Sequence, residues 1–419
     1  MVANTEKKLG TGAGIAWNSV GNFVYLFAQW LLTYVVVKTL GYESAGLFSL
    51  CLTIANQFFG IATYAMRGYQ SSDVEGEYSH LTYVRSRYTT CAAFIVIAVL
   101  FTISKQYEFH VTCCVIVYVL FKATEALSDV YQGILQLGDR LDYVGISFLI
   151  RGGAEFVVFL CAVLLAHNLL LALILLAATS TAIVLFYDRK AASSLVSWGS
   201  SQSEDVRRLL ITCFPIALYG VFLGATGQVP RLAIEELLGA ESLGYYTTVA
   251  MPVVVIQVAA SFIFSPLVTP MARFLKEGDA EGFRKLVVLT LGILLAIAGI
   301  SFVGFYLFGN QVLILVFGES IAPYCYLKTP LLLCTVLTAL SWFLASIITV
   351  LRKLASLCVA SLVSLVIVLV GSVPFVEQFG LNGASYILAV ALSVFIVCCV
   401  GVTVASIKKA GRFSLNSVK

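Results

Sequence analysis

Long apolar segments that contain no charged residue recur along the whole chain. Examples are Ala92–Ile103, Leu169–Tyr187 and Leu286–Leu307. They do not alternate apolar and polar residues, as the strands of a membrane β-barrel would, so they predict helices. A helix that crosses a bilayer needs about 20 apolar residues. This feature constrains the chain to an all-α membrane protein.

The composition excludes the common soluble classes. Of 419 residues, 60% are hydrophobic and 11% are charged, whereas an ordinary soluble domain has about 25% charged residues. A soluble globule cannot bury so much apolar surface, because a folded chain still exposes a large part of itself to water. We therefore exclude a soluble enzyme, a disordered chain and a nucleic-acid-binding domain. The lipid bilayer is the expected surrounding of most of the protein.

The apolar segments predict about 12 transmembrane helices in two lobes of six. The expected spans of the first lobe are 13–37, 44–66, 88–104, 111–137, 144–165 and 169–187, and those of the second are 209–230, 244–270, 287–308, 325–350, 354–374 and 382–407. The predicted organisation is an N-terminal lobe at 1–187, a cytoplasmic connector at 188–208, and a C-terminal lobe with a short cytoplasmic tail at 209–419.

The distribution of basic residues predicts the orientation. With both termini in the cytoplasm, 20 of the 26 Lys and Arg residues fall in inner segments, and four fall in outer segments: Lys38, Lys105, Arg231 and Lys328. Lys122 and Arg151 lie inside spans. Because cytoplasmic loops of membrane proteins are enriched in Lys and Arg, this bias places both termini inside.

A short motif repeats at an offset of 198 residues. Leu40–Gly46 and Leu238–Gly244 share the pattern Leu-Gly-x-Glu-Ser-x-Gly, and each follows the first span of its half. An even number of spans in each half gives both halves the same orientation, which is a parallel repeat about an axis along the membrane normal. Two such lobes predict a central cavity that opens alternately to each side.

Polar residues form stripes on several expected spans. The first span carries Asn18 and Gln29, the fifth carries Arg151 and Glu155, and one face of the fourth carries five polar residues: Lys122, Glu125, Asp129, Gln132 and Gln136. Charges inside a bilayer are expensive and usually face a cavity or a partner. Under one interpretation these side chains line a wet cavity. Under the other they hold helices together, Lys122 pairing with Glu125 or Glu155 and Arg151 pairing with Asp129.

Two further arginines lie near span ends. Arg67 and Arg231 could each contact a phosphate group through bidentate hydrogen bonds, or anchor a span at the interface. The acidic residues Glu125, Asp129 and Glu155 are candidates for coupling to a proton or cation gradient. We expect no catalytic residue, no metal site and no cofactor, because the 11 cysteines lie in apolar runs, the three histidines are scattered, and no nucleotide-binding loop occurs.

Taken together, several segments resemble the polysaccharide-export flippases, of the Wzx type, of the multidrug/oligosaccharidyl-lipid/polysaccharide exporter superfamily. The segments are the turn after the first span, Met66–Arg87, Lys122–Gly153, Cys213–Leu218 and Val229–Tyr246. Within Met66–Arg87 the residues that match the family in order are Arg67, Gln70, Ser72, Asp73, Tyr83 and Arg87. The resemblance covers nearly the whole chain.

The resemblance implies a non-enzymatic function. The family moves an oligosaccharide linked to polyprenyl diphosphate from the inner to the outer leaflet of the bacterial cytoplasmic membrane, for O-antigen (lipopolysaccharide), capsule or exopolysaccharide synthesis. By analogy with related flippases, Arg67, Arg151 and Arg231 would contact the diphosphate. Asn18, Gln29, Gln132 and Gln136 would pair with sugar hydroxyls. Glycosyltransferases and a polymerase of the same pathway would be partners.

Two other functions remain open on the sequence. One is a cation-coupled multidrug exporter of the same superfamily, which would be expected to carry an acidic residue in the core of span one or seven; span one has none. The other is a membrane polymerase or ligase of lipid-linked glycans. Such an enzyme needs catalytic residues on the outer face, where this chain has few charges.

The predicted orientation can be tested by labelling. A cysteine introduced near Ser201 should be shielded from a membrane-impermeant thiol reagent in intact cells, because the segment is expected to be cytoplasmic. Labelling should appear only after the cells are permeabilised. Labelling in intact cells would contradict the topology.

Overall fold

The computed structural model describes residues 11–73, 76–196, 198–264, 270–271, 273–274, 277, 279–351 and 353–416. Throughout these ranges the regular secondary structure is helical, and no strand occurs. The predicted all-α fold is therefore confirmed. Ten helices in the described ranges are long and apolar enough to cross a membrane, and the chain is a multi-pass membrane protein.

Two of these helices are too long for a single crossing. α1 (Thr11–Thr63) has 53 residues and α8 (Ser203–Phe264) has 62, whereas a helix rises about 1.5 Å per residue and the apolar core of a bilayer is about 30 Å thick. Each helix bends at one glycine, Gly41 in α1 and Gly239 in α8. Counting each bent helix twice gives the twelve crossings expected from the sequence.

The two bends lie in the repeated motif and have the same backbone conformation. Gly41 has φ 84° and ψ −179°, and Gly239 has φ 84° and ψ 168°. This combination is accessible almost only to glycine, because a Cβ atom would collide with the neighbouring backbone. The two copies of the motif thus perform the same task, which is to turn the chain between the first and second crossing of each half.

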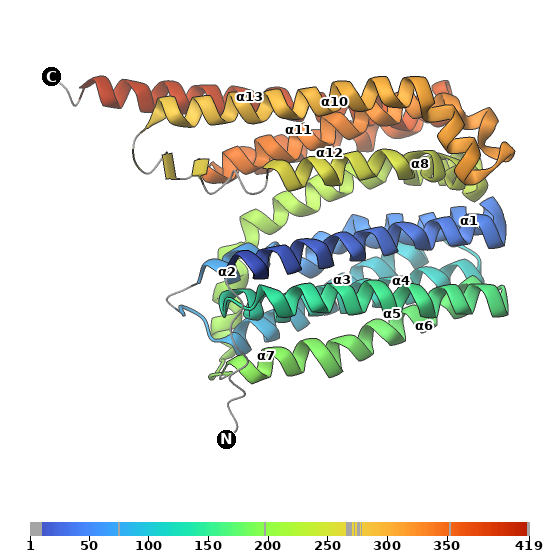
Figure 1. Ribbon diagram of the computed structural model, residues 1–419, viewed down its shortest axis with the longest axis horizontal. Helices are drawn as coiled ribbons and strands as arrows, with labels where there is room; N and C mark the ends of the chain where they lie inside the picture. The colour runs from blue at the N-terminus through green and yellow to red at the C-terminus, as the bar shows by residue number, and fades with distance from the viewer. Residues whose placement is uncertain are drawn as a thin grey trace. The chain divides into compact units, whose positions relative to one another are not determined.

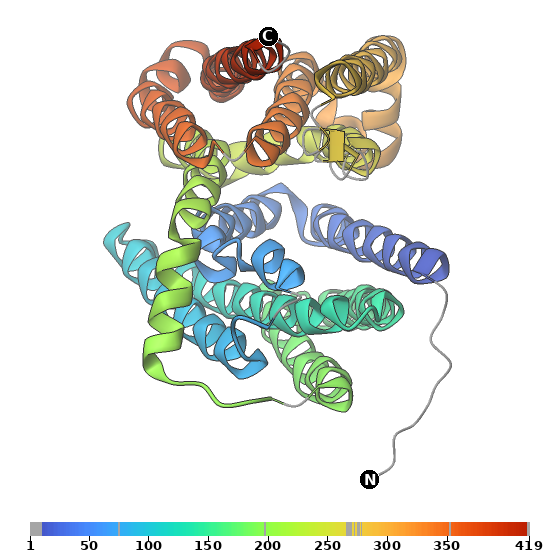
Figure 2. The same ribbon diagram turned by 90° about the vertical axis from the view of Figure 1, so that its left-hand side faces the viewer.

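The chain divides into two compact units, Met1–Gly224 and Ala225–Lys419. The first unit contains α1, the start of α8, and the helices between them: α2 (Met66–Ser72), α3 (His80–Ser104), α4 (Phe109–Leu137), α5 (Leu141–Ala166), α6 (Leu169–Ile183) and α7 (Arg189–Leu195) (Figure 1). Figure 2 looks obliquely along most of these helices, whereas the start of α8 is seen from the side. α4 packs against α1, α2, α3, α6 and α7, so its side chains are well placed to form the interior of the unit.

The observed division differs from the predicted one at both ends of the connector. Helical structure continues beyond residue 187 through a π-helical turn, η1 (Val184–Asp188), and α7. α8 then begins at Ser203, and the boundary between the units falls later, at Gly224. The sequence suggested a connector because the segment 188–208 is short, Ser-rich and basic, but the Asp188 side chain is buried in the first unit.

Small residues let α1 and α5 approach closely. A Cβ atom on Gly21 would collide with the backbone of Gly145, and one on Gly145 would collide with the backbone of Trp17. Two turns further along α5, a Cβ atom on Gly152 would press on the backbone of Tyr25 in α1. Close backbone contact at small residues is the usual way in which membrane helices associate, because lipid provides no hydrophobic drive between them.

The second unit is built from the end of α8 and the helices that follow. These are α10 (Ala280–Phe317), a 3-10 helix η3 (Glu319–Leu327), α11 (Lys328–Val350), α12 (Leu354–Phe379) and α13 (Leu381–Asn416). α13 packs against α12 and α11. Gly383 makes the turn into α13 possible, since a Cβ there would collide with the backbone of Phe375.

The α1–α5 contact yields a matched pair of substitutions. Gly145→Leu should lower the free energy of unfolding by about 1 to 3 kcal/mol or more, because the new side chain has no space against α1. Gly153→Leu is the control, since Gly153 lies on the same helix with nothing within 4 Å of its Cβ position. Thermal stability of the detergent-solubilised protein measures both. Equal stability of the two variants would contradict the close seam.

The bend glycines yield a second prediction. Gly41→Ala and Gly239→Ala should each destabilise the protein by about 1 to 3 kcal/mol through backbone strain alone, since no atom lies within 4 Å of either Cβ position. Gly153→Ala, in a regular helix, should be neutral or stabilising. The same thermal measurement applies, and unchanged stability in both bend variants would rule out a shared conformational role.

Candidate functional site

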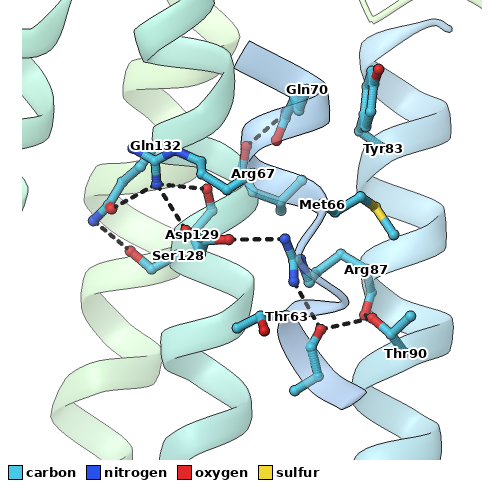
Figure 3. Close-up of polar contacts among 12 residues, drawn as sticks. Thr63, Met66, Arg67, Gln70, Tyr83, Arg87, Thr90, Ser128, Asp129 and Gln132 are labelled. Carbon is cyan, nitrogen blue, oxygen red and sulfur yellow. Dashed lines mark hydrogen bonds and ion pairs between the residues drawn. The ribbon is translucent and has the colours of Figure 1, made fainter. Parts of the chain in front are cut away.

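The polar interior of the first unit is organised around Asp129 on α4 (Figure 3). Arg67 on α2 places Nη1 2.8 Å from Oδ1 of Asp129, and Arg87 on α3 places Nη2 2.9 Å from Oδ2. Each carboxylate oxygen thus has its own guanidinium, and the three groups carry one net positive charge. Charged groups in a membrane span are expensive unless they are paired, so these helices depend on one another here.

Arg87 also stabilises a break in the second crossing of α1. Tyr64 and Ala65, between α1 and α2, have φ values of 51° and 47°, a left-handed conformation that is unfavourable for residues with a side chain. Next to the break, the carbonyl oxygen of Ala62 accepts hydrogen bonds from Arg87 Nη1 and from the Thr90 hydroxyl, both at 2.8 Å. Arg87 is completely buried, so its role is structural.

Arg67 is held by side chains that the sequence analysis placed on one helical face. Its Nε donates to Gln136 Oε1 at 3.0 Å, and its Nη1 donates to Gln132 Oε1 at 3.3 Å and to the carbonyl oxygen of Asp129 at 3.2 Å. The structure therefore brings four predicted binding residues together: Arg67, Asp129, Gln132 and Gln136. Nothing in the sequence specified that Arg67 would contact the other three.

Gln132 connects this group to a deeper set of polar side chains. Its Nε2 donates to the hydroxyls of Ser128 and Ser147 at 3.1 and 3.2 Å. Both hydroxyls in turn donate to Asp188, each at 2.6 Å. Asp188 lies at the end of η1 and is fully buried. The sequence analysis missed it because it begins a charged run; the one available signal was its position directly after an apolar span.

Arg151 on α5 is the cation of the deeper set. It contacts Asp188 and Glu155 at 3.4 Å each and donates to the Ser180 hydroxyl at 2.9 Å. Gln29 on α1 donates to Glu155 at 3.0 Å, so the glycine contact between α1 and α5 lies beside a polar link. One interpretation of the sequence expected Arg151 to pair with Asp129. In the structure Arg151 pairs instead with Glu155 and Asp188.

Lys122 and Glu125 form a separate pair one turn apart on α4. They make an ion pair with each other, which is one of the two pairings expected for Lys122. The ammonium group of Lys122 also lies 4.2 Å from the centroid of the Phe59 ring, a favourable cation–π geometry. Glu125 and Glu155 thus each have a basic partner, as does Asp129.

Exposure separates the network into two parts. The side chains of Arg67 and Asp129 are 27% and 26% exposed, whereas those of Arg151, Glu155 and Asp188 are 2% exposed or less. The deeper set around Arg151 is buried and mostly paired within itself, although Nε of Arg151 has no hydrogen-bond partner among the described residues. The set around Arg67 and Asp129 is partly exposed and can be reached by a ligand. Of the two interpretations of the charged face, packing describes the deeper set, and the accessible Arg67 is the group suited to bind an anion.

Besides the Lys122–Glu125 pair, two predicted site residues lie outside this network. The amide oxygen of Asn18 is buried without a hydrogen-bond partner among the described residues. It lies where α1 approaches Gly145. Arg231 belongs to the second unit, where it lies near Tyr246 and Cys334. Neither residue contributes to the group around Asp129.

The other residues of the family resemblance shape the turn between α2 and α3. Asp73 accepts hydrogen bonds from the Tyr83 hydroxyl and from the backbone N–H groups of Glu77 and Tyr78, at 2.8 to 3.1 Å. Partial burial opposes ionisation, but these hydrogen bonds lower the pKa of Asp73 below its ordinary value. The side chain of Ser72 lies outside the described residues.

Gln70 is a buried link between α2 and α4. Its Nε2 donates to the carbonyl oxygen of Val130 at 3.1 Å, and it lies where a Cβ on Gly133 would be. Gln70 therefore fixes the short helix that carries Arg67.

In the described part of the chain, no cluster of three or more His, Cys, Asp or Glu side chains could hold a metal ion.

Comparison with known proteins gives one similar sequence. No family model matches the chain. The capsular polysaccharide biosynthesis protein CapF of Staphylococcus aureus is 21% identical over 306 residues, which are 72% of this chain and 76% of that protein.

Solved structures match almost the whole chain. An outward-facing multidrug resistance MATE family transporter of the MOP superfamily has a TM-score of 0.67 and 13% identity, with 97% of this chain and 98% of that one covered. A MOP superfamily transporter from Pyrococcus furiosus, described as having a binding pocket of reverse polarity, has a TM-score of 0.63 and 14% identity, with 96% and 97% covered. The chain therefore has the fold of the MOP-superfamily MATE transporters.

Proposed function

We propose that the protein is a flippase that moves an oligosaccharide linked to polyprenyl diphosphate from the inner to the outer leaflet of the bacterial cytoplasmic membrane. The observation that carries the proposal is the accessible Arg67, held by Gln132 and Gln136 beside Asp129. A guanidinium binds phosphate oxygens, and amide side chains pair with sugar hydroxyls. The similarity to CapF supports a role in surface polysaccharide synthesis.

The physical task explains the arrangement. Moving a charged, hydrated headgroup through about 30 Å of hydrocarbon is prohibitive unless polar groups replace the lost water. The headgroup would be carried in a polar cavity that opens to one side of the membrane at a time, while the lipid tail stays in the bilayer. Both termini would be cytoplasmic, and the glycosyltransferases and polymerase of the pathway would act before and after transport.

A second candidate function is cation-coupled export of small organic compounds. The similarity of the fold to multidrug MATE transporters favours it. Two features weigh against it: span one contains no acidic residue, and the candidate coupling acids Glu125, Asp129 and Glu155 are all paired with basic side chains. A proton or cation would have to break an ion pair to bind.

Substitutions on the accessible part of the site test the flippase proposal. Arg67→Gln should reduce surface polysaccharide about tenfold or more, since loss of one charge-assisted contact corresponds to a factor of this size. Lys122→Ala and Asp129→Ala should also block export. Lys285→Gln is the control, because this lysine is exposed and pairs with the exposed Glu281.

The measurement is surface glycan in a strain whose own gene is deleted, with membrane fractions confirming that each variant is present. Asp129→Ala leaves Arg87 buried without its carboxylate, so the amount of folded protein matters most for that variant. Normal surface glycan in Arg67→Gln and Lys122→Ala would reject the transport role of this face. Increased drug sensitivity of the deletion strain with unchanged surface glycan would support the exporter instead.

A further inference from the structure

A groove of 390 Å³ lies on the first unit, between the helix break and the start of α8. Its walls are Tyr64 and five residues on one side of α8, Val206, Arg207, Leu210, Ile211 and Phe214, with Ser203 at the end. Volumes of about 300 to 1,000 Å³ are typical of small-molecule sites. The lining is apolar apart from Ser203, the Tyr64 hydroxyl and Arg207. The groove therefore suits an amphipathic ligand, mostly hydrocarbon with an anionic end.

The groove stays open because the start of α8 is anchored by its other side. Leu209 and Cys213 are buried in a cluster with Met66, Tyr83 and Ile134 of the first unit. By contrast, Ile211 and Phe214 are 63% and 52% exposed. The first turns of α8 thus have one face fixed to the unit and a second, apolar face available to a ligand.

Arg207 is free to accept an anionic partner. Its side chain is 72% exposed, and its ion pair with Glu204, three residues earlier on the same helix, has a distance of 3.8 Å. An exposed pair of this kind contributes little stability. A phosphate group can therefore replace Glu204 at small cost, because its oxygens can accept bidentate hydrogen bonds from the guanidinium.

The groove is joined to the candidate phosphate contact by the chain itself. Tyr64, which forms one wall, is in the left-handed conformation at the break, and Arg67 follows three residues later on α2. A ligand in the groove would touch the residue that sets the direction of the helix carrying Arg67. An isoprenoid chain with a phosphate end fits this lining, since its apolar part can pack on Leu210, Ile211 and Phe214 while its charge meets Arg207.

We propose that this groove binds the isoprenoid phosphate end of the lipid carrier, with Arg207 contacting the phosphate and Leu210, Ile211 and Phe214 packing on the first isoprene units. The proposal rests on the proposed flippase function and adds a site on the first unit at which the lipid part is recognised. The oligosaccharide takes no part in this recognition.

Photo-crosslinking with a soluble probe tests the site. The full-length protein in detergent carries benzoylphenylalanine at position 211 or, as the control, at Leu289, which is 60% exposed on α10 and matches the 63% exposure of Ile211. The probe is radiolabelled farnesyl diphosphate. We expect at least about fivefold more labelling at position 211 than at position 289, a preference that corresponds to about 1 kcal/mol. Unlabelled farnesyl diphosphate should compete, and farnesol, which lacks the charge, should compete several-fold more weakly.

A substitution tests the role of charge. Arg207→Gln should reduce the labelling at position 211 about threefold to fivefold, and Arg207→Lys should retain part of it, since lysine keeps the charge but loses the bidentate geometry. Equal labelling at positions 211 and 289 would overturn the site. Labelling unaffected by Arg207→Gln would overturn the phosphate contact. Equal competition by phosphatidic acid would show a general phospholipid site and overturn the isoprenoid assignment.

The outcome is separable from that of the transport proposal. If position 211 is labelled as expected but Arg67→Gln exports normally, the transport role of Arg67 fails and the groove remains. If Arg67→Gln blocks export while positions 211 and 289 are labelled equally, the groove fails and the flippase proposal remains.

Discussion

The pairing of buried charges is the interaction on which the first unit depends. Asp129 is shared by Arg67 and Arg87, so helices α2, α3 and α4 must meet at one point for any of the three charges to be tolerated in lipid. The deeper pairs of Arg151 impose the same condition on α5 and η1. Removing one partner from such a pair costs more than the pair contributes, because the other charge stays buried.

Helix breaks and glycine contacts make this pairing geometrically possible. The left-handed break at Tyr64 and Ala65 lets α2 carry Arg67 toward α4, and Arg87 stabilises the open end of α1. The contact at Gly21 and Gly145 brings α1 close enough to α5 for Gln29 to reach Glu155. The backbone irregularities therefore lie where polar side chains need to converge, which is common at functional sites.

The two halves share a backbone device but differ in charge. The same glycine conformation turns the chain at Gly41 and Gly239, yet among the described residues the buried ion pairs lie in the first unit. The ion pairs found in the second unit, Arg273–Glu277 and Lys285–Glu281, are well exposed. A repeat preserves the path of the chain more readily than its side chains, so one half can specialise in recognition.

By itself, the sequence determined the helical class, the twelve crossings, the repeated motif and the presence of charges inside spans. These properties follow from the length of each apolar segment and from the conformational freedom of glycine. Both can be recognised from residues that are neighbours in the sequence. The partners of each charge were decided only by the tertiary structure. Arg151 meets Asp188 across 37 positions and Arg67 meets Asp129 across 62, and no local pattern specifies such contacts. The burial of Asp188 was also decided only by the tertiary structure. In the sequence Asp188 follows an apolar run, as a residue at the end of a span would, but α4 and α5 pack around it and place it in the core.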